Sequence, residues 1–319
     1  MKPFVSICTP TFNRRPFIPI IIKCFLQQDY PLDRVEWIVI DDGTDKVGDI
    51  FSKVEQVKYF SYDQKMTLGK KRNLMHEKAK GDILIYMDDD DYYPRNRISH
   101  AVETLQKNPQ ALCAGSSEMY IYFKHIQKMY QFGPYGPNHS TAATFAFRKE
   151  LLNLTRYDDN ACLAEEKQFL KGYTIPFVQL DPLKSILVFS HIHNSYDKKT
   201  MLDNPNKFTN ESNKTVDDFV TDETVKTFFL SDIDDLLKNY EPGDPSYKPD
   251  VQKQMDELIE ARKARTQQST EQKLYEQIVR VSALNTENTM LKEKVAYLEG
   301  KIKELVTETI KLRKGSKLI

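Results

Sequence analysis

The first half of the chain alternates short apolar runs with segments of helical periodicity, and this alternation restricts the fold more than any other feature. Four apolar runs are predicted strands: residues 4–8, 37–40, 57–62 and 83–87. Three segments between and after them have apolar residues at helical spacing: residues 16–28, 68–80 and 95–107. Two of the strands, 37–40 and 83–87, are almost entirely apolar, which is typical of parallel strands covered on both faces. The pattern therefore predicts an α/β fold with a mostly parallel central sheet and helices on both faces.

The pattern becomes mixed after residue 110. Further strands are predicted at residues 111–116, 119–123, 128–132, 143–147 and 186–189, with a short helix at 164–171. Residues 203–250 have fewer apolar positions and more turn-forming residues, so they are predicted to form a linker containing one helix, at 216–239. The globular domain is accordingly expected at residues 1–202.

The last part of the chain, residues 251–319, is predicted to be helical and carries a heptad repeat. Leucine occupies five successive d positions: Leu284, Leu291, Leu298, Leu305 and Leu312. The a positions include Val281, Val295 and Ile302, with Asn288 as the polar exception. β-Branched a residues with leucine at d favour a parallel two-stranded coiled coil. We therefore expect a homodimer through this segment; the alternative is a single amphipathic helix folded back onto the first domain.

Composition excludes some partners. The chain has 46 basic and 46 acidic residues, which gives no electrostatic reason to expect nucleic acid or an anionic membrane as a partner. No apolar run approaches the roughly 20 residues of a membrane span, and no signal peptide is recognisable. The four cysteines are widely spaced, which favours free thiols in a reducing compartment. A soluble, cytoplasmic protein is predicted.

Two acidic sets follow predicted strands. Asp41 and Asp42 follow residues 37–40, and four consecutive aspartates, residues 88–91, follow the strand at 83–87. In an open α/β sheet, ligands bind beyond the carboxyl ends of the strands, where both sets are expected. Carboxylates gathered there need a cation, a ligand hydroxyl or basic side chains to offset their repulsion. Hard oxygen ligands favour Mn²⁺ or Mg²⁺.

Basic residues open the predicted helix that lies between the two acidic sets in the sequence. Lys70, Lys71 and Arg72 stand in its first turn. A helix N-terminus with an arginine beside it favours an anion such as a diphosphate. The alternative for Lys70 and Lys71 is a solvated helix face.

Three stretches of the sequence resemble a known family. They read VSICTPTFNR, WIVIDDGTD and LGKKRNLMHEKAKGDILIYMDDDDYYP, and they are similar to the non-processive, inverting family-two glycosyltransferases with the GT-A fold. The resemblance covers residues 3–107 well, 108–195 loosely, and none of the tail. It implies a Rossmann-like GT-A domain, a nucleoside-diphosphate sugar donor with a UDP-sugar as first choice, and Mn²⁺ or Mg²⁺. The implied reaction is hexosyl transfer, with inversion, to a hydroxyl of a glycan, protein or small-molecule acceptor.

The resemblance also implies roles in nucleotide binding. The end of the first strand would line the nucleotide pocket with Thr9, Pro10 and Thr11. Asp41 would contact the base, and Asp42 the base or the ribose. Arg72 would approach the diphosphate.

The Asp-x-Asp motif of the family falls on Asp88 and Asp90. Asp88 would face the ribose and the metal, and Asp90 the metal. Asp89 is counted with the nucleotide-binding residues, although its loss is expected to matter least of the four. His191 or His193 would complete the metal site, since histidines at this spacing lie on opposite faces of a continuing strand.

The catalytic base is expected within a Glu-Glu pair. The family has Glu-Asp at this point, whereas this chain has Glu165 and Glu166. Glu166 takes the position of the aspartate and is the first candidate, with Glu165 as the second. The alternative for both is an exposed helix start, where the helix dipole favours acids.

Other functions remain open at the level of sequence. A nucleotidyltransferase would use the same ingredients, and so would a catalytically inactive nucleotide-binding domain on a coiled-coil scaffold. The segment around Asp41 is similar to the Asp-x-Asp-Gly-Thr motif of haloacid-dehalogenase phosphatases, but Ile40 stands where their nucleophile would be.

Overall fold

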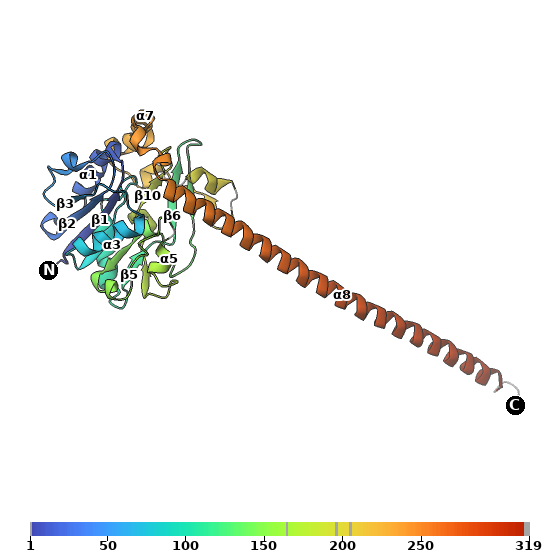
Figure 1. Ribbon diagram of the computed structural model, residues 1–319. Helices are drawn as coiled ribbons and strands as arrows, with labels where there is room; N and C mark the ends of the chain where they lie inside the picture. The colour runs from blue at the N-terminus through green and yellow to red at the C-terminus, as the bar shows by residue number, and fades with distance from the viewer. Residues whose placement is uncertain (1, 164, 195–196, 204–205, 316–319) are drawn as a thin grey trace. The chain divides into compact units, whose positions relative to one another are not determined.

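The chain consists of two units, Met1–Met255 and Asp256–Ile319. A computed structural model describes residues 2–163, 165–194, 197–203 and 206–315. The first unit is an α/β domain, and the second belongs to one long helix (Figure 1).

The central sheet has seven strands in the order β3-β2-β1-β4-β8-β5-β9. Four parallel strands form one half: β1 Val5–Thr11, β2 Val35–Asp41, β3 Val57–Ser61 and β4 Ile83–Tyr86. The other half consists of β8 Ala146–Arg148, β5 Cys113–Gly115 and β9 Phe177–Gln179. Strand β8 runs antiparallel to both β4 and β5. All predicted strands of the first half are present, whereas β9, only three residues long, was not predicted.

Helices cover both faces of this sheet. One apolar cluster joins Trp37 and Val39 of β2 to helices α1 Ile18–Leu26, α2 Gly48–Phe51 and α4 Arg97–Lys107. A second cluster joins Ile38 and Ile40 of the same strand to α3 Leu68–Lys78 and α5 Glu166–Phe169. Successive side chains of a strand point to opposite faces, so a wholly apolar strand must be covered twice. The predicted α/β architecture is confirmed.

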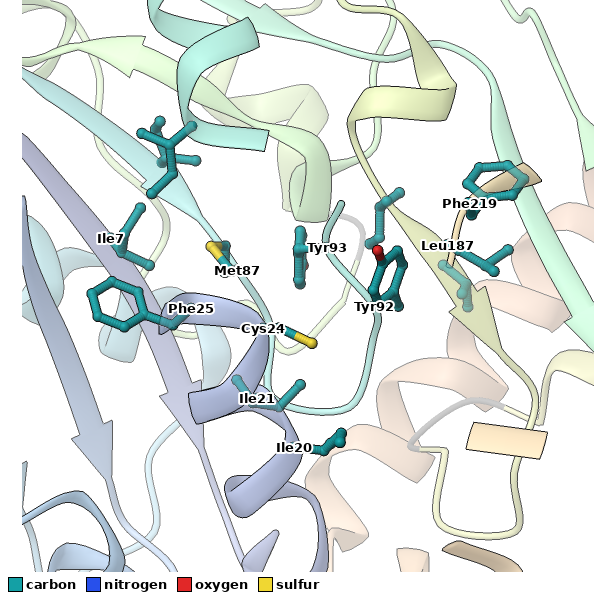
Figure 2. Packing of buried hydrophobic residues seen from close by; sticks show 14 of the residues in the cluster. Ile7, Ile20, Ile21, Cys24, Phe25, Met87, Tyr92, Tyr93, Leu187 and Phe219 are labelled. Carbon is teal, nitrogen blue, oxygen red and sulfur yellow. The ribbon is translucent and has the colours of Figure 1, made fainter. Parts of the chain in front are cut away.

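A smaller sheet holds four strands in the order β10-β6-β7-β11. They are β6 Met119–Phe123, β7 Lys128–Phe132, β10 Leu187–Phe189 and β11 Thr209–Glu211. Strands β6 and β7 form the predicted hairpin. Tyr92, just after the four aspartates, exchanges backbone hydrogen bonds of 3.0 and 2.9 Å with Leu187 of β10. Figure 2 places Tyr92 and Tyr93 in one apolar cluster with Met87 and Leu187, so the acidic segment is anchored to both sheets.

Residues 203–250 differ from the predicted linker. Apolar side chains of this segment belong to the main core: Val216, Phe219, Val220, Val225, Phe228, Phe229, Ile233 and Leu237. The predicted single helix is divided into short pieces: α6 Glu223–Thr227, the π-helical turn Phe228–Asp232 and α7 Ile233–Lys238. Phe229 stacks on Phe189 of β10 with ring centroids 4.6 Å apart. The compact unit therefore extends to Met255 rather than to residue 202. The apolar side chains of this segment are widely spaced in the sequence, but together they pack against the core.

The C-terminal segment is helix α8, Pro249–Gly315. Its heptad leucines are about half exposed in the single chain, for example Leu291 at 54% and Leu298 at 49%. The predicted helix is confirmed, and the coiled coil stays a prediction.

No helix in the described residues is long and apolar enough to cross a membrane. All four cysteines are buried free thiols.

A buried arginine connects the core to the segment before β8. Arg97 of α4 is fully buried, and its Nη2 donates to the carbonyls of Thr144 at 2.8 Å and Phe145 at 2.9 Å. A third, longer bond of 3.3 Å reaches the carbonyl of Tyr86 at the end of β4. Burial lowers the pKa of Arg97 to about 10. These bonds join the strand that carries the aspartates to the neighbouring antiparallel strand.

We expect Arg97→Met to lower the free energy of unfolding by about 2–3 kcal/mol, because it removes three hydrogen bonds and leaves the carbonyl of Thr144 without the guanidinium donor. Urea unfolding followed by circular dichroism measures the change. Arg95→Met is the matched control, since the Arg95 side chain is exposed. Equal unfolding midpoints for the two variants would contradict this role for Arg97.

Candidate active site

Four consecutive aspartates, residues 88–91, follow β4 at the carboxyl edge of the sheet and form what we call the acidic loop. The backbone N–H of Asp88 donates to Tyr93 Oη at 2.7 Å, which fixes the start of the loop. Burial raises the pKa of Asp88, and it raises the pKa of Asp91 still further, with nearby carboxylates adding to both shifts. Burial also raises the pKa of Asp89 to about 7, against the opposing charge of Arg14. The loop therefore holds its carboxylates where charge is costly.

Arg14, which follows β1, supplies the first compensating charge. Its guanidinium lies 3.6 Å from Asp89 Oδ1 and 3.4 Å from Asp90 Oδ2. His191 Nε2 also lies 3.4 Å from Asp90 Oδ2. Burial would raise the pKa of Asp90, but His191 and Arg14 outweigh it and lower this pKa. Sequence reasoning missed Arg14, although its place just after β1 puts it at the same edge as the aspartates.

The acidic loop keeps oxygen atoms that no protein group satisfies. Asp88 Oδ1, Asp89 Oδ2 and Asp91 Oδ1 are buried and have no hydrogen-bond partner. Buried carboxylate oxygens without partners are costly unless a cation or a donor reaches them, and hard oxygen ligands suit Mn²⁺ or Mg²⁺. The donor set thus fits such an ion chemically. Within the described residues, no three His, Cys, Asp or Glu side chains are already gathered as a metal site.

The two predicted histidines lie in different surroundings. The side chain of His191 is 1% exposed and contacts Asp90, and burial lowers its pKa to about 3. His193 is buried beside Gly243, and burial lowers its pKa to about 4. Its backbone carbonyl accepts a 2.9 Å hydrogen bond from Arg14. Of the two, His191 is the one next to the acidic loop.

A buried ion pair joins Arg72 of α3 to Glu165. Arg72 Nε donates to Glu165 Oε1 at 2.9 Å, and the guanidinium lies 4.3 Å from the ring centroid of Tyr86. Burial opposes the charge of Arg72, but Glu165 outweighs it and raises the pKa of the arginine. Glu166 begins the short helix α5 and is partly exposed. The two glutamates are therefore unequal, with Glu165 occupied by Arg72.

The first acidic pair is turned inward. Asp41 accepts hydrogen bonds from Gly43 N at 2.9 Å and Val47 N at 3.0 Å, and from the hydroxyl of Tyr59. Asp42 pairs with Lys71 Nζ at 2.8 Å. Both carboxylates thus have partners within the protein. The hydrogen bond from Gly43 N to Asp41 Oδ1 forms an Asx turn at the start of the β2–α2 connection.

Thr9 is likewise engaged inside the sheet. Its hydroxyl donates to the carbonyl of Met87 at 2.6 Å and accepts from Trp37 Nε1 at 2.8 Å. Thr11 is buried, and its hydroxyl has no hydrogen-bond partner in the described structure. Thr9 therefore fixes β1 to the start of the acidic loop.

A pocket of about 180 Å³ opens beside the acidic loop. Five predicted site residues line it: Pro10, Arg72, Asp88, Asp89 and Asp90. The other eight are not among its described lining residues: Thr9, Thr11, Asp41, Asp42, Glu165, Glu166, His191 and His193. The lining also includes residues that were not predicted: Phe12, Arg14, Lys65 and Lys248. Lys65 and Lys248 carry no recognisable local signal, because only the folded chain brings them to this edge.

The fold and the site together define a GT-A-like α/β protein with mixed sheets. The family model described as glycosyl transferase family 2 matches residues 6–163, just under half of the chain, so this part of the chain is a domain of that family.

Curated relatives match the same region at moderate identity. An uncharacterized glycosyltransferase of Haemophilus influenzae is 29% identical, over 36% of this chain and 47% of the relative. The poly(ribitol-phosphate) β-N-acetylglucosaminyltransferase TarS of Staphylococcus aureus is 27% identical, over 32% of this chain and 19% of its own length. The putative teichuronic acid biosynthesis glycosyltransferase TuaG of Bacillus subtilis is 28% identical, over 33% and 43%. The chain thus spans less than half the length of each of these relatives.

Solved structures are also similar, at lower identity. The mannosyltransferase PcManGT of Pyrobaculum calidifontis, in complex with GDP-Man and Mn²⁺, has a TM-score of 0.48 and 17% identity, over 59% of this chain and 57% of its own. S. aureus TarS in complex with UDP has a TM-score of 0.45 and 19% identity, over 59% and 61%.

We expect Arg72→Met to destabilise the fold by about 3–5 kcal/mol, because it leaves Glu165 buried without its partner. The double variant Arg72→Met, Glu165→Met should be more stable than the single variant, since no unpaired charge remains. Denaturant unfolding of both variants measures this coupling. Lys70→Met is the control, because Lys70 lies two residues earlier in the same helix and is exposed. A double variant as unstable as the sum of its single variants would contradict the pairing.

Proposed function

We propose that this protein is a metal-dependent, inverting glycosyltransferase. It transfers a sugar from a nucleoside-diphosphate sugar, with a UDP-sugar as the first choice, to an acceptor hydroxyl. The observation that supports this most is the acidic loop beside a pocket that Arg14, Lys71 and Arg72 also line. Carboxylates and cations around one pocket suit a ligand that contains both a diphosphate and a divalent ion. The names of the relatives, which describe glycosyltransferases, agree with sugar transfer.

We assign the metal to the acidic loop. Asp88 and Asp90 would hold Mn²⁺ or Mg²⁺, with His191 as a further ligand and His193 as the less favoured one. When bound, the ion neutralises charge that develops on the diphosphate. Asp89 is ion-paired with Arg14 and would shape the nucleotide end of the site.

The donor is assigned to the pocket beside the loop. Pro10 and Arg72 would contact the nucleotide and the diphosphate directly. Thr9, Thr11, Asp41 and Asp42 would support the base and ribose site from behind, since the first three are fully or almost fully buried and Asp42 is held by Lys71.

We assign the chemical step to Glu166. It accepts the proton of the acceptor hydroxyl while that oxygen forms a bond to the anomeric carbon. The bond from this carbon to the diphosphate oxygen breaks, and the nucleoside diphosphate leaves with the electron pair. Attack from the side opposite the leaving group inverts the configuration. Glu165 acts as a positioning residue, because its carboxylate is occupied by Arg72.

We further propose that α8 forms a parallel coiled-coil homodimer. The heptad leucines are exposed along one stripe of the helix, where they would be covered by the same residues of a second copy. Charges beside the stripe are complementary between two parallel copies: Glu287 at g faces Lys292 at e, and Lys294 faces Glu299. Asn288 at an a position would fix the register.

Incubation with Mn²⁺ and a panel of nucleotide sugars should release nucleoside diphosphate in the presence of an acceptor. We expect Glu166→Gln to lower kcat roughly 10²–10⁴-fold, as loss of a general base does. Asp90→Ala should abolish the dependence on metal concentration. Glu77→Gln, which removes an exposed carboxylate from α3, is the control. A wild-type protein that neither binds nor turns over any nucleotide sugar would overturn the proposal.

Two further outcomes of the same assay decide its details. A product with retained anomeric configuration, read by NMR, would refute inversion. Full activity of Glu166→Gln with loss of activity in Glu165→Gln would transfer the role of base to Glu165.

The dimer is tested by mass in solution. Light scattering at micromolar concentration should give twice the monomer mass for the wild type and the monomer mass for Leu291→Lys, Leu298→Lys, because two buried charges would face each other at each layer. The matched control is Met290→Lys, Tyr297→Lys, which adds the same charges at exposed positions one residue away. A monomeric wild type would refute the dimer.

A further inference from the structure

Residues 240–254 lie beyond the family domain, yet they dock beside the acidic loop. Asn13 and Arg14, which follow β1, hold the start of this segment. Asn13 Nδ2 donates to the carbonyl of Pro242 at 2.7 Å, and Arg14 Nη1 donates to that of Gly243 at 3.5 Å. Tyr240 Oη donates to Asp45 at 2.9 Å. The residues that hold the segment thus include Arg14, which also pairs with the acidic loop.

The close approach at this end requires glycine. A Cβ on Gly243 would lie 2.6 Å from His193 Nδ1 and 3.0 Å from the carbonyl oxygen of Asn13. Real Cβ atoms essentially never come so near, so a larger residue would force the segment away from the site.

The other end of the segment is held by residues that include Lys65 and Cys162 of the pocket lining. Lys65 forms an ion pair with Asp250. Gln254 accepts a 2.9 Å hydrogen bond from Cys162 N and donates one of 2.8 Å to the carbonyl of Asn160. All of these residues lie within the first unit. The segment is thus fixed at both ends, with Lys248 between the two anchors.

Lys248 lies in the pocket among other cations. It is 9% exposed and lines the same pocket as Arg72 and the acidic loop. Three ammonium groups from separate parts of the chain surround the ring of Phe12: Lys65 at 5.6 Å, Lys71 at 5.9 Å and Lys248 at 5.7 Å from its centroid. Lys65 pairs with Asp250 and Lys71 with Asp42, and the charges of Asp89 and Asp90 also act on Lys248, so the cations are held in place around the pocket by carboxylates. Burial lowers the pKa of Lys248 to about 7, and Arg14 and Lys71 contribute to this lowering.

The start of α3 adds a second anion-binding feature to the same pocket. This helix has 11 residues, and Leu68 and Lys71 of its first turn line the pocket. The N–H groups of Gly69, Lys70 and Lys71 already donate to Ala161 and Thr67, so it is the positive dipole end of the helix that favours a negatively charged group here. Lysines and a helix start around one pocket are the surroundings in which phosphate oxygens bind.

We propose that Lys248 binds the diphosphate of the nucleotide donor, and that residues 240–254 therefore complete the donor site from outside the family domain. The inference rests on the proposed function, since it concerns the same donor. The compact unit needs this segment for binding as well as for packing. The helix that carries the heptad repeat begins at the next residue, Pro249.

Binding of UDP, GDP and inorganic pyrophosphate, each with Mn²⁺, tests the inference by isothermal titration calorimetry on the full chain. Loss of one charged hydrogen bond should weaken binding of the nucleoside diphosphate roughly tenfold or more in Lys248→Met. Uridine and guanosine, which lack phosphate, should bind the variant and the wild type alike. Lys248→Arg should retain most of the affinity. Lys253→Met removes an exposed lysine five residues later and should bind like the wild type.

The outcomes separate this inference from the proposed function. If the wild type binds UDP or GDP and Lys248→Met binds equally well, the role of Lys248 is refuted and the proposed function stands. If pyrophosphate binds in a Lys248-dependent way but no nucleotide or nucleotide sugar does, the anion site stands and the proposed function falls. If the wild type binds neither, both fall. Thermal unfolding of each variant confirms that the binding change is not a loss of fold.

Discussion

The repulsion among four consecutive aspartates, two of them buried and two partly buried, is the constraint on which this site depends. Burial raises the pKa of Asp88, Asp89 and Asp91, so the acidic loop is stable only where positive groups reach it. The positive charge comes from Arg14, which follows β1, while His191, whose pKa burial lowers to about 3, approaches from the residues after β10 as a neutral imidazole. Tyr92 and Tyr93 fix the loop to the apolar core. The charge of the acidic loop therefore has to be offset at one edge of the central sheet, where the loop also contacts the smaller sheet.

The cations at the start of α3 have partners outside the acidic loop. Lys71 pairs with Asp42, and Arg72 pairs with Glu165, at 2.8 and 2.9 Å. Such buried pairs contribute little net stability but are costly to break, so they hold the basic groups in fixed places beside the pocket. The acidic loop meanwhile keeps three oxygens without partners. The arrangement is that of a site organised before its ligand arrives, which reduces the cost of ordering it on binding.

The part of the chain beyond the matched domain is needed to complete the core and the pocket. Phe229 stacks on β10, and Tyr240 and Gly243 bring the following segment to the residues after β1. The matched family domain, residues 6–163, therefore describes just under half of the chain, while the pocket beside the acidic loop is lined by residues as far along the chain as Val251. Differences in specificity within such a family are expected where these added segments differ.

The sequence alone determined the parallel strands, the helices on both faces, the acidic edge and the heptad pattern, because each is a local periodicity or a local run of residues. It also placed Asp88, Asp90 and Arg72 at one edge, since the ends of parallel strands meet there. It did not predict β9, β11 or the docking of residues 206–255, whose apolar residues are few and scattered. Only the tertiary structure decided which charges pair: Arg14 with Asp89 and Asp90, and Arg72 with Glu165. These partners lie far apart in the chain, and an ion pair depends on distances that no local pattern encodes.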